Sequence, residues 1–270
     1  MTELQEKLLG IFSWYHDFCE NNGLTYFALG GTALGAVRHN GFIPWDDDID
    51  VGMPRKDYER FLDISKTIDK NSRYTVEFPS DKKDYVYPFA KVYDKETTLV
   101  ENTRYKTKRG IYIDVFPIDG VGNTEKEATV YYKKVDRYIA FFHTRVCALR
   151  KGRKLYKNAA ILISRCIPDF LFKPQNMLKK IDILSKRHSF ENCKFVANFV
   201  GNWHEKEIMN KEWIGNLKLC NFEQLKMYIL ENYDAYLTHM YGDYMTPPPP
   251  HKQISHHDFL YINLFKSYLE

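Results

Sequence analysis

The stretch ALGGTALGAVRHNGFIPWDDDIDV, residues 28–51, decides the fold of this chain. It joins a pair of glycines, which opens a predicted helix, to four carboxylates within five positions: Asp46, Asp47, Asp48 and Asp50. Like charges at this spacing repel one another, and a divalent cation is the usual means by which a protein keeps several of them ionised. The stretch therefore predicts a metal site, with phosphate as the expected ligand of the metal.

The glycine pair follows a short apolar strand, LTYFAL at residues 24–29, so that a strand, a turn and a helix succeed one another. Thr32 is placed to cap the helix, whose first backbone N–H groups would face an anion. Gly30 and Gly31 would let a phosphate approach the backbone closely. Two glycines before a helix more often form a plain tight turn, so this pattern by itself is a weak signal.

The acidic cluster is expected to form one side of a buried strand. In an extended segment Asp48 and Asp50 project from one face, while Ile49 and Val51 project into the core. A solvated acidic loop would not be bracketed by so many apolar and aromatic residues. A calcium-binding loop is rejected because Val51 and Asp57 stand where such a loop requires glycine and usually has glutamate.

A third carboxylate and a lysine lie further along the chain. Asp114, in the apolar strand GIYIDVFPID, is expected to be paired, protonated or metal-bound, because burying an unpaired carboxylate is costly. The upstream cluster favours the metal. Lys91 is a candidate phosphate contact, although its spacing fits a solvated strand lysine equally well. Asp119 follows Pro117 and is predicted to lie in a turn.

The composition is that of a globular protein, with 270 residues, 44% of them apolar and 16% aromatic. A net charge of only +4 argues against nucleic acid as the main partner. Five scattered cysteines without a C-x-x-C pair fit a reduced cytosol. The N-terminus is typical of an amphipathic helix rather than a signal peptide. We therefore expect a cytoplasmic protein, soluble or peripheral at the inner face of the cell membrane.

Residues 1–123 are expected to form the catalytic core, and residues 124–270 a mainly helical cover with a C-terminal substrate-binding tail, in one continuous structural unit. Long helical patterns occupy roughly residues 124–149, 155–167 and 175–190. The segment LRKGRKLYKNAAILISRCIPDFLFK, residues 149–173, combines a basic start with an apolar helix. This combination is typical of peripheral membrane helices, although a core helix with a solvated basic end is the favoured interpretation.

The tail contains four consecutive prolines, which form a stiff extended linker, followed by His251, His256 and His257. These histidines have neither a cysteine partner nor the i, i+4 spacing of a helical metal site, so hydrogen bonding or substrate contact is favoured over metal binding.

Four motifs resemble the LicD family, which includes bacterial phosphocholine transferases and is related to fukutin. They are GGTALGAVRHNGFIPWDDDIDV, the following MPRKDYERF, the later IDVFPID and the terminal YGDYMTPP. The resemblance runs almost end to end and is thin between residues 125 and 208. It implies an α+β nucleotidyltransferase-like fold, a mixed sheet with flanking helices and a largely helical C-terminal half.

In that fold a glycine turn, an Asp-x-Asp pair and a third aspartate on a neighbouring strand form the site. The resemblance places the turn at Gly30 and Gly31, the pair at Asp48 and Asp50, and the third carboxylate at Asp114. These aspartates would then be the catalytic residues and would bind Mg²⁺ or Mn²⁺, with two ions expected.

The remaining candidates surround these aspartates. Gly30, Gly31, Thr32, Arg38 and Lys91 are the expected phosphate or donor contacts, and Arg38 pairing with Asp46 or Asp47 is the alternative. Asp46, Asp47 and His256 are left to orient the loop or to contact the acceptor. The cysteine cluster that would form a zinc module in animal relatives is absent, so no structural zinc is expected.

The resemblance implies transfer of a phospho-alcohol, phosphocholine above all, from a CDP-linked donor such as CDP-choline to a sugar hydroxyl, with release of CMP. The acceptor would be a cell-surface glycan, such as teichoic acid or lipopolysaccharide, or its lipid-linked precursor. Two alternatives remain: a nucleotidyltransferase that moves a nucleotide from an NTP to a sugar or small molecule, and a non-catalytic binding protein of the same fold.

Overall fold

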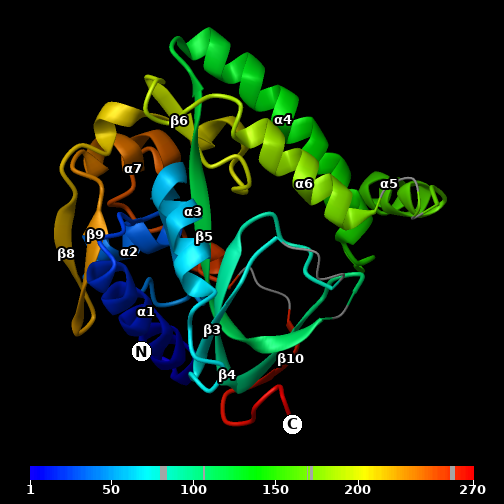
Figure 1. Cartoon of the computed structure of the whole chain (residues 1–270), viewed down its shortest axis with the longest axis horizontal. Helices are drawn as coiled ribbons and strands as arrows, with labels where there is room; N and C mark the ends of the chain where they lie inside the picture. Colours follow the sequence, from blue (N-terminus) through cyan, green and yellow to red (C-terminus); the bar gives the residue numbers. More distant parts are fainter. Residues whose placement is uncertain (80–83, 106, 169, 171–172, 256–258) are drawn as a thin grey trace.

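A computed structural model describes residues 1–79, 84–105, 107–168, 170, 173–255 and 259–270 (Figure 1). The helices are α1 (Glu3–Asn21), α2 (Gly30–His39), α3 (Arg55–Ser65), α4 (Glu125–Val146), α5 (Leu155–Arg165), α6 (Pro174–Ser185) and α7 (Tyr233–Tyr241). The strands are β1 (Phe27–Ala28), β2 (Asp50–Pro54), β3 (Tyr74–Glu77), β4 (Ala90–Glu101), β5 (Lys108–Gly122), β6 (Phe195–Ala197), β7 (Ile208–Asn210), β8 (Lys218–Phe222), β9 (Leu225–Ile229) and β10 (Phe259–Asn263).

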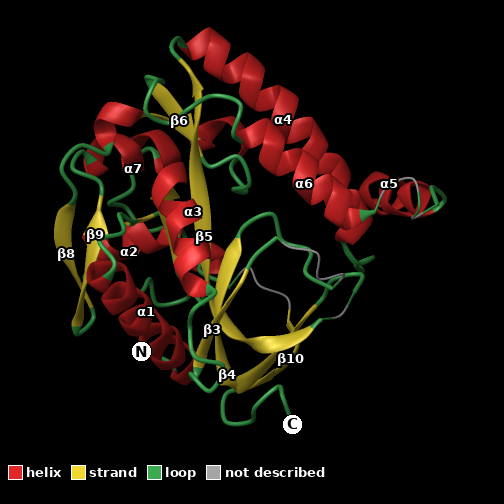
Figure 2. Ribbon diagram, viewed as in Figure 1, coloured by secondary structure: helices red, strands yellow, loops and turns green. Residues whose placement is uncertain are grey.

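The core is a mixed sheet with the strand order β1-β2-β5-β4-β10. Strand β2 runs parallel to β5, and the other described pairs are antiparallel. Strand β3 adds to β4, and β6 and β7 extend the sheet from the far end of β5, while β8 and β9 form a separate hairpin. With helices packed around this sheet (Figure 2), the α+β prediction is confirmed.

Local signals account for the ends of the first two helices. A capping box between Thr2 and Gln5 starts α1, and Asn22 ends it. Helix α2 ends at Asn40, whose φ of 55° lies in the left-handed region that asparagine tolerates. The long strand β5 is almost continuously buried, because it has sheet partners on both sides and α1, α3 and α4 packed against it.

The C-terminal half contains the three predicted helices α4, α5 and α6, and also completes the sheet. Strand β6 pairs with β5, and β10 pairs with β4. Helices α4 and α6 lie side by side, and α5 lies at the outer end of this pair (Figure 1).

The turn predicted at Asp119 is wrong, because Asp119 lies inside β5 and is only 1% exposed. Along one edge of β5 the pairing with β4 stops at Ala90–Val115 and the pairing with β6 starts at Asp119–Ala197, while along the other edge β2 places Met53 opposite Pro117. Pro117 therefore lies between β4 and β6, where its missing N–H removes no hydrogen bond to either of them, and the strand continues through it.

The buried Asp119 carboxylate binds Arg55, the first residue of α3. The Nε and Nη2 atoms of Arg55 donate to its two oxygens at 2.7 and 2.5 Å. Asp182 of α6 accepts a further hydrogen bond from Arg55 at 3.1 Å. This ion pair fixes α3 and α6 to β5, the strand that carries Asp114.

We expect Asp119→Ala to lower the free energy of unfolding by about 3–5 kcal/mol, because it leaves the largely buried guanidinium of Arg55 without its bidentate partner. Urea unfolding followed by circular dichroism measures the loss. Asp63→Ala is the control, since its pair with Lys66 is exposed and worth less than about 1 kcal/mol. Equal losses in the two variants would contradict the structural role of Asp119.

Candidate active site

Asp50, Asp114 and Lys91 occupy one row across three neighbouring strands. Asp50 of β2 is the register partner of Asp114 of β5, and Asp114 is the register partner of Lys91 of β4. Residues paired directly across a sheet project from the same face. The two aspartates, far apart in the sequence, therefore lie side by side, with a lysine next to them.

The backbone around Asp50 is held on both sides. Its carbonyl accepts a hydrogen bond from Leu29 N at 3.0 Å, and its N–H donates to Thr32 Oγ1 at 2.8 Å. On the other side, Asp114 N donates to the carbonyl of Ile49 at 2.9 Å. These bonds fix the glycine turn, the acidic segment and β5 relative to one another.

The predicted capping role of Thr32 is wrong. Helix α2 begins at Gly30, so Leu29 is its N-cap residue, and no side chain caps the helix. Thr32 lies in the third helical position with 3% of its surface exposed, and its hydroxyl binds Asp50 instead. Its effect on the site is to position Asp50.

We expect Thr32→Val to lower the free energy of unfolding by about 1–3 kcal/mol, because the nearly isosteric valine leaves the Asp50 N–H without its acceptor. Turnover should fall as well, since Asp50 loses one of its positioning contacts. Thr32→Ser keeps the hydroxyl and is the matched control. Equal losses of stability and turnover in Thr32→Val and Thr32→Ser would show that the hydrogen bond from the Asp50 N–H to the Thr32 hydroxyl is not responsible for them.

The glycine turn is shaped by contacts on both of its residues. Gly30 has a φ of +49°, a conformation that favours glycine, and its N–H donates to the hydroxyl of Tyr236 at 2.9 Å. A Cβ placed on Gly31 would lie 2.7 Å from Oδ2 of Asp46, so that carboxylate lies directly against the turn. The turn thus brings Asp46 to the site, and phosphate binding by the turn stays a prediction.

The surroundings of Asp50 disfavour its ionised form. Burial raises the pKa of Asp50 well above its ordinary value, and the negative charges of Asp48 and Asp114 raise it further. Asp47 and Asp48 line a small cavity of about 10 Å³ together with Tyr112, the residue two positions before Asp114. The acidic segment and Asp114 of β5 are therefore close enough to disfavour ionisation of Asp50.

Lys91 is not a solvated strand lysine, because its side chain is only 2% exposed. Its Nζ lies 2.7 Å from Oδ1 of Asp114. It also lies 3.3, 4.3 and 5.3 Å from the ring centroids of Tyr112, Tyr87 and Phe89. Burial lowers the pKa of Lys91, whereas Asp114 and the electron-rich ring faces favour the charged ammonium.

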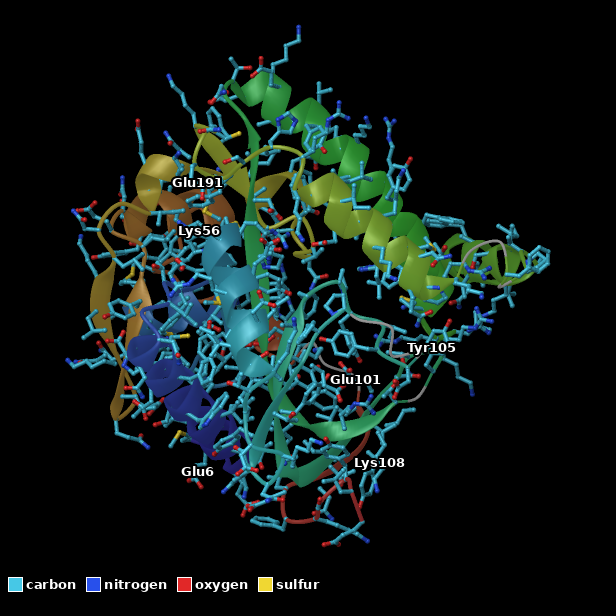
Figure 3. The ribbon with its side chains drawn as sticks, viewed as in Figure 1. Glu6, Lys56, Glu101, Tyr105, Lys108 and Glu191 are labelled. Atoms are coloured by element: carbon cyan, nitrogen blue, oxygen red, sulfur yellow. The ribbon has the colours of Figure 1, made fainter. Side chains whose placement is uncertain are left out.

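Glu101, labelled in Figure 3, orients two of these rings. Its carboxylate accepts hydrogen bonds from the hydroxyls of Tyr87 and Tyr112. A second carboxylate thus stabilises the arrangement around Lys91 through the rings. The phosphate contact of Lys91 stays a prediction.

The other candidates lie around this row. Arg38 donates to the carbonyl of Tyr244 at 2.6 Å, and its pairing with Asp46 or Asp47 stays a prediction. Asp47 accepts a hydrogen bond from Ser255 Oγ, which brings the C-terminal tail to the acidic segment. His256 lies outside the described residues.

Several contacts of the site were not anticipated from the sequence. Tyr87, Phe89 and Lys91 alternate in the sequence, and this period of two could have revealed their common face. Tyr236, which binds Gly30, and Gln5, whose Nε2 donates to the carbonyl of Asp46 at 2.8 Å, carry no local signal because they come from distant segments.

The residues of the site suit a divalent cation in their chemistry. Carboxylate oxygens are the ligands that Mg²⁺ prefers, and Asp50 and Asp114 are direct neighbours. Considering only the residues that the structure describes, no three histidine, cysteine, aspartate or glutamate side chains are already gathered into a metal cluster. Asp114 instead contacts Lys91, so the carboxylates would have to draw together to bind a metal.

Comparison with known proteins agrees with this arrangement. Residues 23–148, which include the glycine turn and all members of the row, match the family described as LicD/FKTN/FKRP, nucleotidyltransferase domain. Over 95% of its length the chain is 32% identical to the lipopolysaccharide cholinephosphotransferase LicD of Haemophilus influenzae, 96% of which is covered. The chain belongs to the LicD family. The resemblance seen in the motifs is thereby confirmed.

Two further relatives match a shorter part of this LicD-family chain. Uncharacterized proteins of Rickettsia typhi and Rickettsia prowazekii are 28% and 26% identical to it. Each match covers 47% of this chain, and 46% and 54% of the two relatives.

Proposed function

We propose that this LicD-family chain transfers phosphocholine from CDP-choline to a sugar hydroxyl of a cell-surface glycan, such as lipopolysaccharide, or of its lipid-linked precursor. The observation that carries the proposal is the Asp50–Asp114 pair beside the glycine turn, in a chain that matches a cholinephosphotransferase over 95% of its length. Because the donor is a cytoplasmic nucleotide, the proposed place of reaction is the inner face of the cell membrane.

The chemistry is a displacement at phosphorus. The acceptor hydroxyl oxygen attacks the phosphorus atom that carries choline, a new P–O bond forms, and the P–O bond to the leaving CMP breaks. The hydroxyl proton is released. Such a transfer depends mainly on positioning the two oxygens in line and on neutralising the charge of the phosphates.

Asp48, Asp50 and Asp114 would hold Mg²⁺ or Mn²⁺, with two ions expected. When bound, the ions would neutralise the diphosphate and polarise its oxygens. Thr32 keeps Asp50 in place through the Asp50 N–H, and the turn at Gly30 and Gly31 offers backbone close to the site.

Lys91, the lysine of the row, would supply a positive charge beside the carboxylates. Lys91 lies against Asp114 and would attract the phosphates of the donor, while the surrounding rings limit its access to water. Arg38 lies at the C-terminal end of α2 and is proposed to contact the donor from there. Asp46 lies against the glycine turn, and Asp47 accepts a hydrogen bond from Ser255. Both aspartates are proposed to contact the acceptor hydroxyls.

A nucleotidyltransferase activity is the second candidate, because the matched family carries that description for its domain. Such an enzyme would use the same aspartates on an NTP. The relative matched along nearly its whole length is instead named for transfer of phosphocholine, which favours the first candidate. A purely binding role is disfavoured, because Asp48, Asp50 and Asp114 are all retained.

A thermal-shift experiment tests the donor. Since a ligand that binds only the folded state raises the melting temperature, CDP-choline with Mg²⁺ is expected to raise it more than CDP-glycerol, CDP-ribitol or CTP with Mg²⁺. Omitting Mg²⁺ should remove most of the shift. A larger shift with CTP, or the same shift with and without Mg²⁺, would contradict the proposal.

A further inference from the structure

Helix α5 exposes most of an apolar sequence. Of its eleven residues, LYKNAAILISR, only Ile161 and Ser164 are buried. Leu155 is 87% exposed, Ile163 is 68% exposed, and Leu162 is 52% exposed. A helix at the surface of a water-soluble protein normally buries such residues, so the exposed apolar surface of α5 indicates an interaction site.

The exposed apolar residues form one stripe. With about 100° of rotation per residue, Leu155, Ala159, Leu162 and Ile163 fall within one arc of the helix, and Cys166 continues it. The buried residues lie on the opposite side of the helix. The core-helix interpretation favoured by the sequence is therefore wrong, because the apolar stripe faces outward.

Helix α5 is anchored in this orientation from α4. The fully buried Arg145 of α4 donates to the carbonyls of Ser164 and Ile167, the latter at 2.8 Å. The Ser164 hydroxyl donates to the carbonyl of Thr144 at 2.9 Å. The helix lies at the outer end of the α4–α6 pair (Figure 1), so its exposed stripe is presented away from the sheet.

Positive charge gathers at the start of α5. The sequence of residues 149–173 holds seven lysines and arginines and one acidic residue, Asp169. Lys151, Lys154, Lys157 and Lys173 are exposed, and none of them forms an ion pair with another described residue. Lys154 and Lys157 stand at the start of α5, where positive charge opposes the helix dipole. Helix stability thus does not account for their position.

We propose that α5 and the preceding residues 149–154, the α5 patch, bind this protein to the surface of an anionic lipid bilayer. The apolar stripe would enter the interface between headgroups and acyl chains, and Lys151 and Lys154 at the start of the helix would bind the lipid phosphates. No helix in the described ranges is long and apolar enough to cross a membrane, so the attachment is peripheral. The excess of positive charge favours a negatively charged surface over an uncharged protein groove.

Vesicle co-sedimentation at low salt tests the proposal. The full chain should pellet with vesicles of equal parts phosphatidylglycerol and phosphatidylcholine, and much less with phosphatidylcholine alone. Leu155→Glu combined with Ile163→Glu should lower the partition coefficient at least about 10-fold, because the charges cannot enter the apolar layer. Both positions are exposed, so the variant should keep the parent's circular dichroism spectrum and melting temperature.

The matched control is Leu219→Glu combined with Ile183→Glu, which changes two exposed apolar residues outside the patch and should bind vesicles as the parent does. Equal binding by the patch variant and the parent, or no preference of the parent for anionic vesicles, would overturn the proposal. A patch-dependent dimer in sedimentation velocity without vesicle binding would identify a second copy as the occupant instead.

Transfer to a water-soluble acceptor should be unchanged in the patch variant, so this test is independent of the proposed function.

Discussion

Asp50→Asn is expected to lower turnover at least about 10³-fold, while the metal-free variant unfolds at a higher urea concentration than the parent at neutral pH. The first effect follows from the loss of a charged oxygen ligand for the ion that would stabilise the transferring phosphate. The second follows from the burial of Asp50 and from the like charges of Asp48 and Asp114, which together oppose ionisation of Asp50 in the folded state.

The pH dependence of this second effect has a definite sign. The pKa of Asp50 is raised on folding, so the folded state holds its proton more tightly than the unfolded state does. At pH values above the unfolded pKa, Asp50 therefore lowers stability, and the full cost is reached above the folded pKa. The stability advantage of Asp50→Asn should be largest at neutral pH and should vanish as the pH falls below about 4, the ordinary pKa of an unfolded aspartate, because Asp50 is then protonated in both states.

Urea unfolding of the two proteins with EDTA, repeated across this pH range, measures the difference. Asp57→Asn is the control, because Asp57 lies on α3, away from the row of the site, in a partly exposed pair with Arg60. A variant that keeps its turnover would remove Asp50 from the chemistry. A variant that is less stable than the parent at neutral pH would instead make Asp50 a structural residue.

Lys91→Met is expected to lower the free energy of unfolding by about 3–5 kcal/mol in the absence of divalent ions. The substitution removes the buried ammonium 2.7 Å from Asp114, and removing one partner of a buried ion pair leaves the other charge uncompensated. Turnover should fall as well, because the donor phosphates lose a nearby positive charge. Added Mg²⁺ should restore more stability to this variant than to the parent, since the ion would take over the compensation of Asp114.

Lys108→Met is the matched control, because Lys108 lies at the exposed start of β5 and is labelled in Figure 3. It should change stability by no more than about 0.5 kcal/mol. Urea unfolding repeated at increasing MgCl₂ concentrations measures both the loss of stability and the stabilisation by Mg²⁺. An Mg²⁺ response of Lys91→Met no larger than that of the parent would contradict the proposal that a metal and Lys91 both compensate Asp114.

The central row could be predicted in part from the sequence. A strict alternation of apolar and acidic residues identified Asp48 and Asp50, and the isolated carboxylate in an apolar strand identified Asp114. The position of Lys91 beside Asp114 could not be predicted, because it depends on the register between β4 and β5, and no local sequence pattern specifies that register. The same limit applies to Tyr236 and Gln5, which reach the site from the far end and the beginning of the chain.

Errors of the sequence interpretation have a common physical origin. Thr32 has the chemistry of a capping residue, but the helix starts earlier, and the hydroxyl binds the next strand instead. Asp119 follows a proline, but the proline falls in the gap between β4 and β6 along one edge of β5 while β2 pairs with it along the other edge, so the strand continues. In both cases tertiary contacts outweighed a local preference.

The measurement that tests the account most directly is product analysis after incubation of the purified protein with Mg²⁺, CDP-choline and a lipopolysaccharide acceptor. We expect CMP to form in the same amount as phosphocholine bound to the glycan, and both to disappear with EDTA or in Asp50→Asn. Release of pyrophosphate from CTP, with a nucleotide attached to the acceptor and no CMP formed from CDP-choline, would contradict phosphocholine transfer.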